Sequence, residues 1–535
     1  MTDKDFIVAI ELGSSKISAI AGKKKDGTMH VLAYAEEKTQ GCIRRGIVFN
    51  IEKTNQCINN VLNKLENTLK AKIVRTYVGL GGLSVRSYRC VIKRNMLTQS
   101  HIKNETIDGI RQESYEIPFS DYEVLENFPQ EYVVDQNVVT DPVGVMGTNI
   151  DGEFLDVIAK QKLRNNIQAA FANTVVEIED ELIAPLELAN NILADSEKRS
   201  GCVLVDLGAE TTTVLVYKNN IVRYLVTIPM GMNNVNKDFA TIQIEDAEAE
   251  DIKLKYGDME AMNNDDDVEE PQTYTTSDGR KLEVSLIQNI IIARVSEIIA
   301  NVSNQINKSN YSDKLLAGII LTGGGSNMKG IDKAFMTSIN LDKCRIARTV
   351  NQPVIKTSNA PSFTPDNAMT NTIVSLLMAG TQPCGGDEYK GGDIFGLAEQ
   401  ADERAARMKE QAEKMRQEQE DVARYDEVKT AIREEYDKVM KAIEEIERYG
   451  RDKKIRQSAQ ALSLTALEVL GESYKTATAA LDGKDKFKQA LTEGGNLATM
   501  LQKAVDRLTD AVNKANKENS FMGRFKKTID EILSE

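Results

Sequence analysis

Two segments far apart in the chain share one pattern: an apolar run, an acidic residue with a glycine two positions later, and a second apolar run. Residues 6–22 read FIVAIELGSSKISAIAG, and residues 201–220 read GCVLVDLGAETTTVLVYKNN. Each segment predicts two β-strands joined by a polar turn, with Gly13 or Gly208 in the turn. The two turns lie about 195 residues apart, so each can belong to a domain of its own.

Such turns suit phosphate binding, because a glycine lets backbone N–H groups approach a ligand closely and the hydroxyl side chains beside it add donors. If the two turns faced each other across a cleft, they would clamp a polyphosphate. The carboxylates of Glu11 and Asp206 would then face a hydrated Mg²⁺ rather than the phosphates directly. Each segment could also be an ordinary β-hairpin, so the prediction depends on the occurrence of two matched turns.

A third glycine-rich turn follows another apolar run. Residues 315–331 read LLAGIILTGGGSNMKGI, which predicts a buried strand, a turn over residues 322–326 and then a helix. Glycines directly after a strand allow a ligand to approach the backbone. Turns of this kind are common, but as the third of three in this order the segment strengthens the prediction of a phosphate-binding cleft.

Length and composition narrow the class of protein. The 535 residues are too many for one hydrophobic core, so we expect about two to four domains. The net charge of −14 argues against nucleic acid as a partner. The six cysteines form no C-x-x-C pair, which argues against a zinc site or a disulfide framework and suits a reducing cytosol. The N-terminal residues lack a signal-peptide pattern, and no apolar run approaches ~20 residues. We therefore expect a protein that is soluble or only peripherally attached to a membrane.

The three turns in this order resemble the nucleotide site of the superfamily that includes actin and the sugar kinases. Over residues 6–380 the chain more specifically resembles the FtsA family of bacterial cell-division proteins. Segments 126–147, 246–257 and 364–380 match that family beyond the turns. The resemblance implies an α/β fold with two actin-like lobes, built from duplicated RNase H-like domains, and ATP between them. It also implies an inserted SHS2-type α+β subdomain, called 1C, and the composition after residue 384 predicts a helical C-terminal extension.

The expected domain bounds combine this resemblance with changes in composition. Subdomain 1C is expected at residues 84–163, with strands at 84–94, 131–139 and 153–161 and a helix at 101–117. The other expected bounds are lobe 1 at 1–83, 164–200 and 361–383, lobe 2 at 201–360, a glycine-rich linker at 384–396, a charged helical extension at 397–519 and an amphipathic membrane-targeting helix at 520–535.

The resemblance also assigns the nucleotide site residue by residue. The first phosphate loop matches Gly13, Ser14, Ser15 and Lys16, the second matches Asp206, Gly208, Thr211 and Thr212, the ribose-side helix matches Glu250 and Lys253, and the adenosine loop matches Gly323, Gly324 and Ser326. ATP and Mg²⁺ are the implied cofactors, with Glu11 and Asp206 facing the metal ion through water. The pair Glu250 and Lys253, three residues apart on one helix face, could instead be a surface ion pair.

The chain departs from the family pattern at three places. Glu11 stands where the first loop usually has Asp. Glu210 stands in a second loop that is usually Gly-Gly-Gly, and its charge should weaken polyphosphate binding unless it points away or meets Mg²⁺. Ala184 and Pro185 stand where vigorous actin-like ATPases place a Glu or Gln beside the attacking water, with Glu187 as a nearby candidate. We therefore expect slow or negligible hydrolysis, with ATP acting as an assembly ligand that holds the lobes closed.

Residues 284–306 predict an amphipathic helix, because apolar residues recur at three- and four-residue steps. In the family the polar side of this helix helps to receive the C-terminal peptide of the tubulin-like protein FtsZ. Arg294 and Glu297 match the family's Arg-x-x-Glu pattern there. A solvated helix face that binds no partner is the alternative.

The last segment, residues 520–535, predicts a short helix with apolar residues on one side and charges on the other. Its apolar side would carry Phe521, Met522, Phe525, Ile529, Ile532 and Leu533. Two Phe beside basic residues suit insertion at an anionic lipid surface, and the family ends in such a membrane-targeting helix. Docking of this helix on the protein itself is the alternative, and the sequence leaves open what residues 397–515 do.

Together these features predict an actin-like ATP-binding cell-division protein. It would polymerise at the cytoplasmic face of the bacterial inner membrane at the division site, anchor FtsZ filaments and help to recruit later divisome proteins. A pilus-assembly actin-like scaffold and a small-molecule kinase of the same superfamily are the alternatives. The match at 246–257 and the terminal helix favour the first function, because a kinase has no use for a terminal amphipathic helix.

Overall fold

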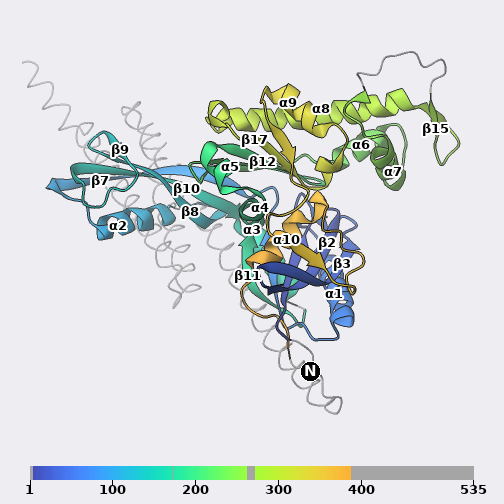
Figure 1. Cartoon of the computed structure of the whole chain (residues 1–535), viewed down its shortest axis with the longest axis horizontal. Coiled ribbons are helices and arrows are strands. Elements are labelled where there is room, and N and C mark those ends of the chain that lie inside the picture. Colours follow the sequence, from blue (N-terminus) through green and yellow to red (C-terminus); the bar gives the residue numbers. More distant parts are fainter. Residues whose placement is uncertain (1–3, 118, 173, 262–271, 387–535) are drawn as a thin grey trace, which may run out of the picture. The chain divides into compact units, whose positions relative to one another are not determined.

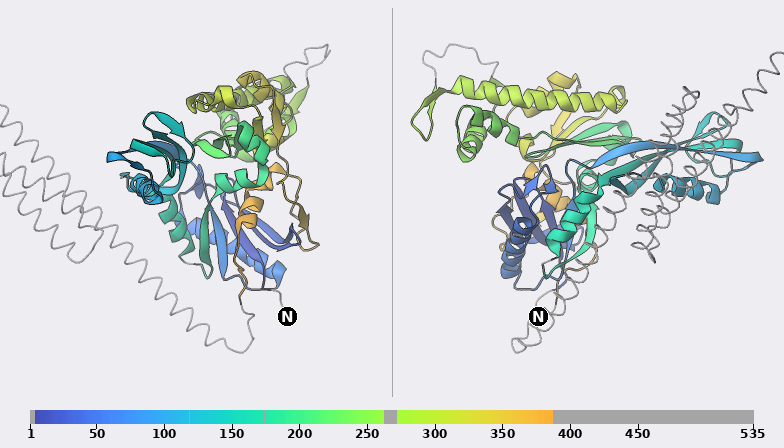
Figure 2. Two further views of the ribbon diagram at one scale, coloured as in Figure 1. Left: turned by 60° about the vertical axis from the view of Figure 1, so that its left-hand side comes forward. Right: turned by 180° about the vertical axis from the view of Figure 1, so that it is seen from behind.

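The computed structural model describes residues 4–117, 119–172, 174–261 and 272–386 of the chain. These residues form two lobes and an inserted subdomain within one compact unit (Figures 1 and 2). A second unit, residues 396–535, lies outside the described residues. The predicted linker, helical extension and terminal helix therefore fall almost wholly outside the described part of the chain.

Lobe 1 is built on a six-stranded sheet of order β11-β6-β1-β2-β3-β19. The strands are β1 (Ile7–Leu12), β2 (Lys16–Lys25), β3 (Thr28–Lys38), β6 (Arg75–Leu80), β11 (Glu177–Ile183) and β19 (Val354–Lys356). Strands β1, β2 and β3 are antiparallel neighbours, whereas β6 pairs in parallel with both β1 and β11. Asp26 and Gly27 form the two-residue turn that joins β2 to β3. Both have positive φ, because a turn of that kind matches the twist of the two strands it joins.

The helices of lobe 1 cover this sheet. Helix α1 (Ile51–Leu69) begins at Asn50, whose side chain accepts a hydrogen bond from the backbone N–H of Lys53 at 2.9 Å. It packs against β2 and β3 beside α3 (Gln161–Phe171), whereas α10 (Asn371–Ala379) packs against β1, β2 and β6 beside α4 (Ala184–Ile192). The apolar faces of all four helices join the sheet in one hydrophobic core.

Lobe 2 repeats the strand–turn–strand start of lobe 1. Strands β12 (Cys202–Leu207), β13 (Thr212–Lys218) and β14 (Ile221–Ile228) are antiparallel, and β17 (Gly318–Thr322) and β18 (Cys344–Ile346) follow in parallel on the other side of β12. The helices are α5 (Asp195–Ser200), α6 (Asn233–Thr241), α7 (Asp246–Tyr256), α8 (Val284–Lys308) and α9 (Ile331–Ile339), and a hairpin of β15 (Thr273–Thr275) and β16 (Lys281–Glu283) precedes α8.

Helix α8 occupies the segment that the periodicity predicted. Among the described residues it is the one helix long and apolar enough to cross a membrane by length and composition. Most of its buried side chains, from Ile287 to Ile306 at steps of mostly three or four residues, pack in the core of lobe 2. This helix is therefore a core element of the lobe.

The inserted subdomain has a core of its own. It consists of β7 (Arg86–His101), α2 (Asn104–Tyr115), β8 (Tyr122–Val134), β9 (Asn137–Val139) and β10 (Met146–Lys160). Buried residues at its far end, including Ile110 and Phe154, form a cluster separate from those of the lobes, whereas Leu155 and Val157 of β10 join the core that contains the lobe 1 sheet. The prediction of one strand over 131–139 was wrong, because Asp135 and Gln136 both adopt positive φ and turn the chain from β8 into β9. The Asp135 carboxylate fixes that turn by accepting hydrogen bonds from the backbone N–H groups of Thr148 and Asn149, each at 2.9 Å.

The strands of the insert continue the sheet of lobe 2. The order of the nine-stranded sheet is β18-β17-β12-β13-β14-β7-β10-β8-β9, so that β7, β10, β8 and β9 extend away from β12 and β17 (Figure 1). The junction is the pair Val226 and Arg86. Next to it, Ser87 exchanges two hydrogen bonds with the backbone of Leu225, at 2.9 and 3.1 Å. By contrast, the chain returns to the lobe 1 sheet through β19 at Val354, ahead of the predicted bound at residue 361.

Candidate functional site

A cavity of about 600 Å³ lies between the two lobes, a size that suits a small-molecule ligand. Residues from both strand–turn–strand segments, the third glycine-rich turn and α7 line it. Of the predicted residues, the lining contains Glu11, Gly13, Ser14, Ser15, Lys16, Asp206, Gly208, Thr211, Glu250, Lys253, Gly323 and Gly324. Two predicted residues, Thr212 and Ser326, lie outside this lining and are fully buried.

The first and second turns have the same construction. In the first, a Cβ on Gly13 would lie 2.7 Å from the carbonyl oxygen of Lys16. In the second, a Cβ on Gly208 would lie 2.8 Å from the carbonyl oxygen of Thr211, to which the N–H of Gly208 donates at 2.9 Å. Because each turn folds back over its own third following residue, only glycine fits without a shift. Lobe 1 and lobe 2 thus present matched turns to one cavity.

The third turn lies against the second. Gly323 has φ 81° and passes so close to Asp206 that a Cβ there would lie 2.3 Å from the carboxylate oxygen. Ser326 donates to the carbonyl of Gly323 at 2.8 Å, so its hydroxyl holds the turn together. Thr212 has a similar supporting role, because its hydroxyl donates to the carbonyl of Met230 at 2.8 Å.

Helix α7 presents Glu250 and Lys253 to the cavity as a connected pair. The Lys253 amine donates to the Glu250 carboxylate at 2.6 Å and to the side-chain oxygen of Asn236 at 3.1 Å. The amide of Asn236 donates to the same Glu250 oxygen at 2.9 Å. Lys253 is buried, so this is not the surface ion pair that the spacing alone allowed. Sequence reasoning missed Asn236, which lies on α6 and has no motif around it.

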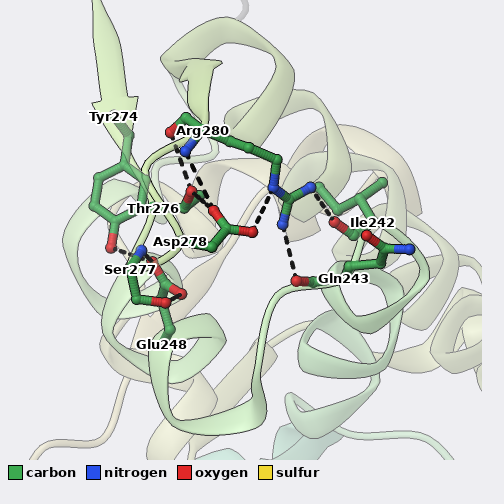
Figure 3. A network of polar contacts seen from close by, with 8 residues as sticks. All are labelled: Ile242, Gln243, Glu248, Tyr274, Thr276, Ser277, Asp278 and Arg280. Atoms are coloured by element: carbon green, nitrogen blue, oxygen red, sulfur yellow. Dashed lines mark hydrogen bonds and ion pairs between the residues drawn. The ribbon is translucent and has the colours of Figure 1, made fainter.

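A second network holds α6 and α7 in place (Figure 3). Glu248, in the first turn of α7, accepts hydrogen bonds from the backbone and hydroxyl of Ser277 at 2.8 and 2.7 Å and from the Tyr274 hydroxyl at 3.0 Å. Arg280 donates to the carbonyls of Ile242 and Gln243, each at 2.9 Å, and so caps the end of α6. The β15–β16 hairpin therefore fastens the two helices that carry Asn236 and Glu250.

Two carboxyl groups face the cavity from opposite lobes. Burial, and then the nearby charge of Asp206, raise the pKa of Glu11 to about 7. Burial raises the pKa of Asp206 to about 6. Both shifts mean that the negative charges lack full compensation, which is what a cation at this place would supply.

This donor set fits a hydrated divalent ion better than a cage of protein ligands. Among the described residues, no group of three or more His, Cys, Asp or Glu side chains is arranged to hold a metal. Mg²⁺ commonly keeps several water ligands and uses only one or two carboxylates together with phosphate oxygens. Glu11 and Asp206 match that pattern.

Comparison with known proteins decides the family. The family model described as cell division protein FtsA matches residues 203–364, and the model of the SHS2 domain inserted in FtsA matches residues 82–158. The cell division protein FtsA of Porphyromonas gingivalis is 31% identical over 386 residues, which make up 70% of this chain and 78% of that protein. The chain belongs to the FtsA family. It is therefore an actin-like cell-division protein.

Other FtsA proteins are more distant. The FtsA of Pseudomonas aeruginosa is 26% identical over 333 residues, 61% of this chain and 79% of that protein. The FtsA of Escherichia coli is 24% identical over a match that makes up 64% of this chain and 84% of that protein. A solved structure of the PilM–PilN type IV pilus biogenesis complex covers 70% of this chain and 99% of its own at 15% identity and a TM-score of 0.50, which shows the shared fold alone. The predicted two-lobed actin-like fold with an SHS2 insertion is confirmed.

The departures from the FtsA pattern have clear places in the structure. Ala184 and Pro185 line the cavity, whereas Glu187 does not. Glu210 also lies outside the lining, because its carboxylate accepts a hydrogen bond from the backbone N–H of Arg45 in lobe 1 at 2.6 Å. Its carboxylate is therefore bound to the backbone of lobe 1, a partner that the sequence did not predict.

The residues matched to the FtsZ-peptide pattern of FtsA lie on α8. Arg294 donates twice to the carboxylate of Asp238 on α6, both at 2.6 Å, and also contacts Glu297. Sequence reasoning missed Asp238, which lies outside the Arg-x-x-Glu pattern. The membrane residues predicted at the end of the chain, Phe521, Met522, Phe525, Ile529, Ile532 and Leu533, lie outside the described residues.

Proposed function

We propose that this FtsA-family protein binds ATP in the cavity and assembles into filaments at the cytoplasmic face of the bacterial inner membrane. There it anchors FtsZ filaments through its C-terminal amphipathic helix and helps to recruit later divisome proteins. The observation that carries the nucleotide part is the pair of matched glycine turns, one from each lobe, that line one cavity.

Each part of the cavity has a role in this proposal. The backbone N–H groups of the two turns and the hydroxyls of Ser14, Ser15 and Thr211 donate to phosphate oxygens. Glu250, oriented by Lys253, accepts from the ribose hydroxyls. Glu11 and Asp206 would hold Mg²⁺ through water, and the ion would supply positive charge beside the phosphates.

Hydrolysis is expected to be slow or absent. Ala184 and Pro185 are the residues that line the cavity where an active actin-like ATPase positions water, and neither side chain can orient or deprotonate a nucleophile. ATP then acts as a ligand of the closed arrangement of the lobes. Single-turnover hydrolysis should therefore be far slower than nucleotide release.

The decisive experiment is equilibrium binding of a fluorescent ATP analogue to the full chain in the presence of Mg²⁺. We expect binding by the wild type and at least about tenfold weaker binding by Asp206→Ala, because the variant loses the carboxylate that faces the metal ion. Asp251→Ala, an exposed residue on α7, is the matched control and should bind like the wild type. Absence of binding by the wild type would refute the nucleotide site.

The partner and membrane parts need their own tests. Arg294→Ala should weaken binding of the FtsZ C-terminal peptide, and Asp238→Ala should do the same if that carboxylate orients the arginine. Removal of residues 520–535 should abolish sedimentation with anionic vesicles. If the truncated protein still sediments with the vesicles, the terminal helix is not the membrane anchor.

A further inference from the structure

The short hairpin of β4 (Ile43–Arg44) and β5 (Ile47–Val48) is a part of lobe 1 that the nucleotide motifs do not include. Its two-residue turn is Arg45 and Gly46, with φ 51° and 73°. These positive values place both residues in the left-handed region, as in the two-residue turns of tight hairpins.

The two N–H groups of this tip reach both phosphate turns. Gly46 donates to the Ser14 hydroxyl of the first turn at 2.8 Å, within lobe 1. Arg45 donates to the Glu210 carboxylate of the second turn at 2.6 Å, across to lobe 2. One hairpin tip thus contacts the turns that line the cavity from opposite lobes.

Both ends of the Arg45–Glu210 contact rest on stiff supports. On the lobe 1 side, the Arg45 carbonyl accepts from the N–H of Leu83 at 3.0 Å, and a Cβ on Gly46 would lie 2.5 Å from the Cα of Gly82. On the lobe 2 side, the carbonyls of residues 208 and 209 accept from the N–H groups at the start of α6, at 3.0 and 2.7 Å. Because neither support can follow a movement of the other lobe easily, opening the cleft at this place must break the contact.

We propose that Glu210 is a positioning residue that fixes the second phosphate turn to hairpin β4–β5 and so holds this side of the cleft closed without a bound phosphate. The sequence departure supports this assignment, since a glycine at position 210 would offer no carboxylate to the Arg45 N–H. In this chain a protein carboxylate makes the lobe-to-lobe contact that a ligand phosphate would otherwise have to bring about. The identity of the ligand in the closed cleft rests on the proposed function. The Glu210 contact itself does not depend on it.

Hydrogen–deuterium exchange of the full chain without nucleotide tests the contact directly. The readout is the peptide spanning residues 42–50, which contains the Arg45 amide. In Glu210→Ala we expect that amide to exchange about tenfold faster than in the wild type, because a hydrogen bond to a charged acceptor is lost. Glu210→Gln keeps an acceptor oxygen and should restore much of the protection.

Two comparisons separate this role from a general loss of structure. Glu283→Ala removes an exposed glutamate elsewhere in lobe 2 and should leave the exchange of residues 42–50 unchanged. Peptides from the lobe 2 core, such as α8, should exchange equally in all variants. If the 42–50 peptide of Glu210→Ala exchanges at the same rate as in the wild type, the proposal is overturned. Faster exchange throughout lobe 2 in that variant would overturn it as well.

Adding ATP and Mg²⁺ afterwards distinguishes the two proposals. If nucleotide protects the 42–50 peptide again in Glu210→Ala, a bound phosphate can replace the carboxylate as the closing contact, as we expect. If the unliganded difference is seen but nucleotide changes nothing in any variant, the cavity does not bind ATP, while the Glu210 contact stands.

Discussion

Replacing Glu11 by glutamine should make the unliganded protein more stable near pH 8 than the wild type. In the folded chain burial and the charge of Asp206 raise the pKa of Glu11 from 4.5 to about 7. Between those two values the folded state keeps a proton that the unfolded chain has released. Stability is therefore lost as the pH rises through this window, and the loss is complete above about pH 7. The glutamine side chain of the variant carries no charge and should escape this loss.

The size of the effect follows from the same shift. The interval from 4.5 to about 7 corresponds to about 3 kcal/mol of unfolding free energy, since each pH unit is worth about 1.4 kcal/mol. The side chain lines a cavity that admits water, so we expect about 2 kcal/mol in practice. Near pH 4.5 the variant and the wild type should be equally stable, because both then carry a neutral side chain.

The measurement is urea denaturation of both proteins from pH 4.5 to 8.5, with EDTA present and nucleotide absent. Glu52→Gln, an exposed glutamate on α1, serves as the control and should track the wild type at every pH. Mg²⁺ added near pH 8 should narrow the gap, because the cation would stabilise the ionised wild type. A difference between Glu11→Gln and wild type that is constant with pH, or that has the opposite sign above pH 7, would refute the reasoning.

Three further predictions concern packing and turn geometry. Gly208→Ala should weaken ATP binding at least about tenfold in the fluorescence assay, because its Cβ would lie 2.8 Å from the Thr211 carbonyl and force the turn to shift. Phe154→Ala should destabilise the insert by about 3–5 kcal/mol, so that limited proteolysis cleaves within residues 86–160 while the lobes stay intact. Arg223→Ala should lower the unfolding free energy of the whole unit in urea by about 2 kcal/mol, because it removes the donor to the side-chain oxygen of the buried Gln130, whereas the exposed Lys93→Ala should have no effect.

The parts of the fold that depend on local patterns could be predicted from the sequence. Buried alternation or continuous apolar runs predicted the strands on either side of Gly13 and Gly208, and the three- and four-residue steps predicted α8. The strand expected at 131–139 failed for a local reason, since no Gly, Asn-Gly or Pro marks the turn at Asp135 and Gln136. The carboxylate contacts that stabilise this turn come from β10, which is distant in sequence.

The site was predictable only where a motif carries it. The turns contributed matched glycines, and those residues do line the cavity. Contacts between segments were not predictable, such as Asn236 with Glu250, Asp238 with Arg294, and the Arg45 amide with Glu210. Each of these contacts depends on how two elements pack against each other. The spacing of residues within one helix or strand does not predict that packing.

The shared sheet has a mechanical consequence. By sequence the insert interrupts lobe 1, yet its strands extend the sheet of lobe 2 through a junction that is one residue pair wide, Val226 with Arg86. On either side of this junction the neighbouring strands are joined by long antiparallel ladders. Side chains supply most of the other bonds at this joint: Gln130 donates to the carbonyl of Val222 at 3.0 Å, and Arg223 donates to the side-chain oxygen of Gln130 at 3.3 Å, beside the Ser87 bonds. A pull on the insert would load these side chains together with the single backbone rung, so the strength of the joint depends on side-chain identity more than on a backbone ladder.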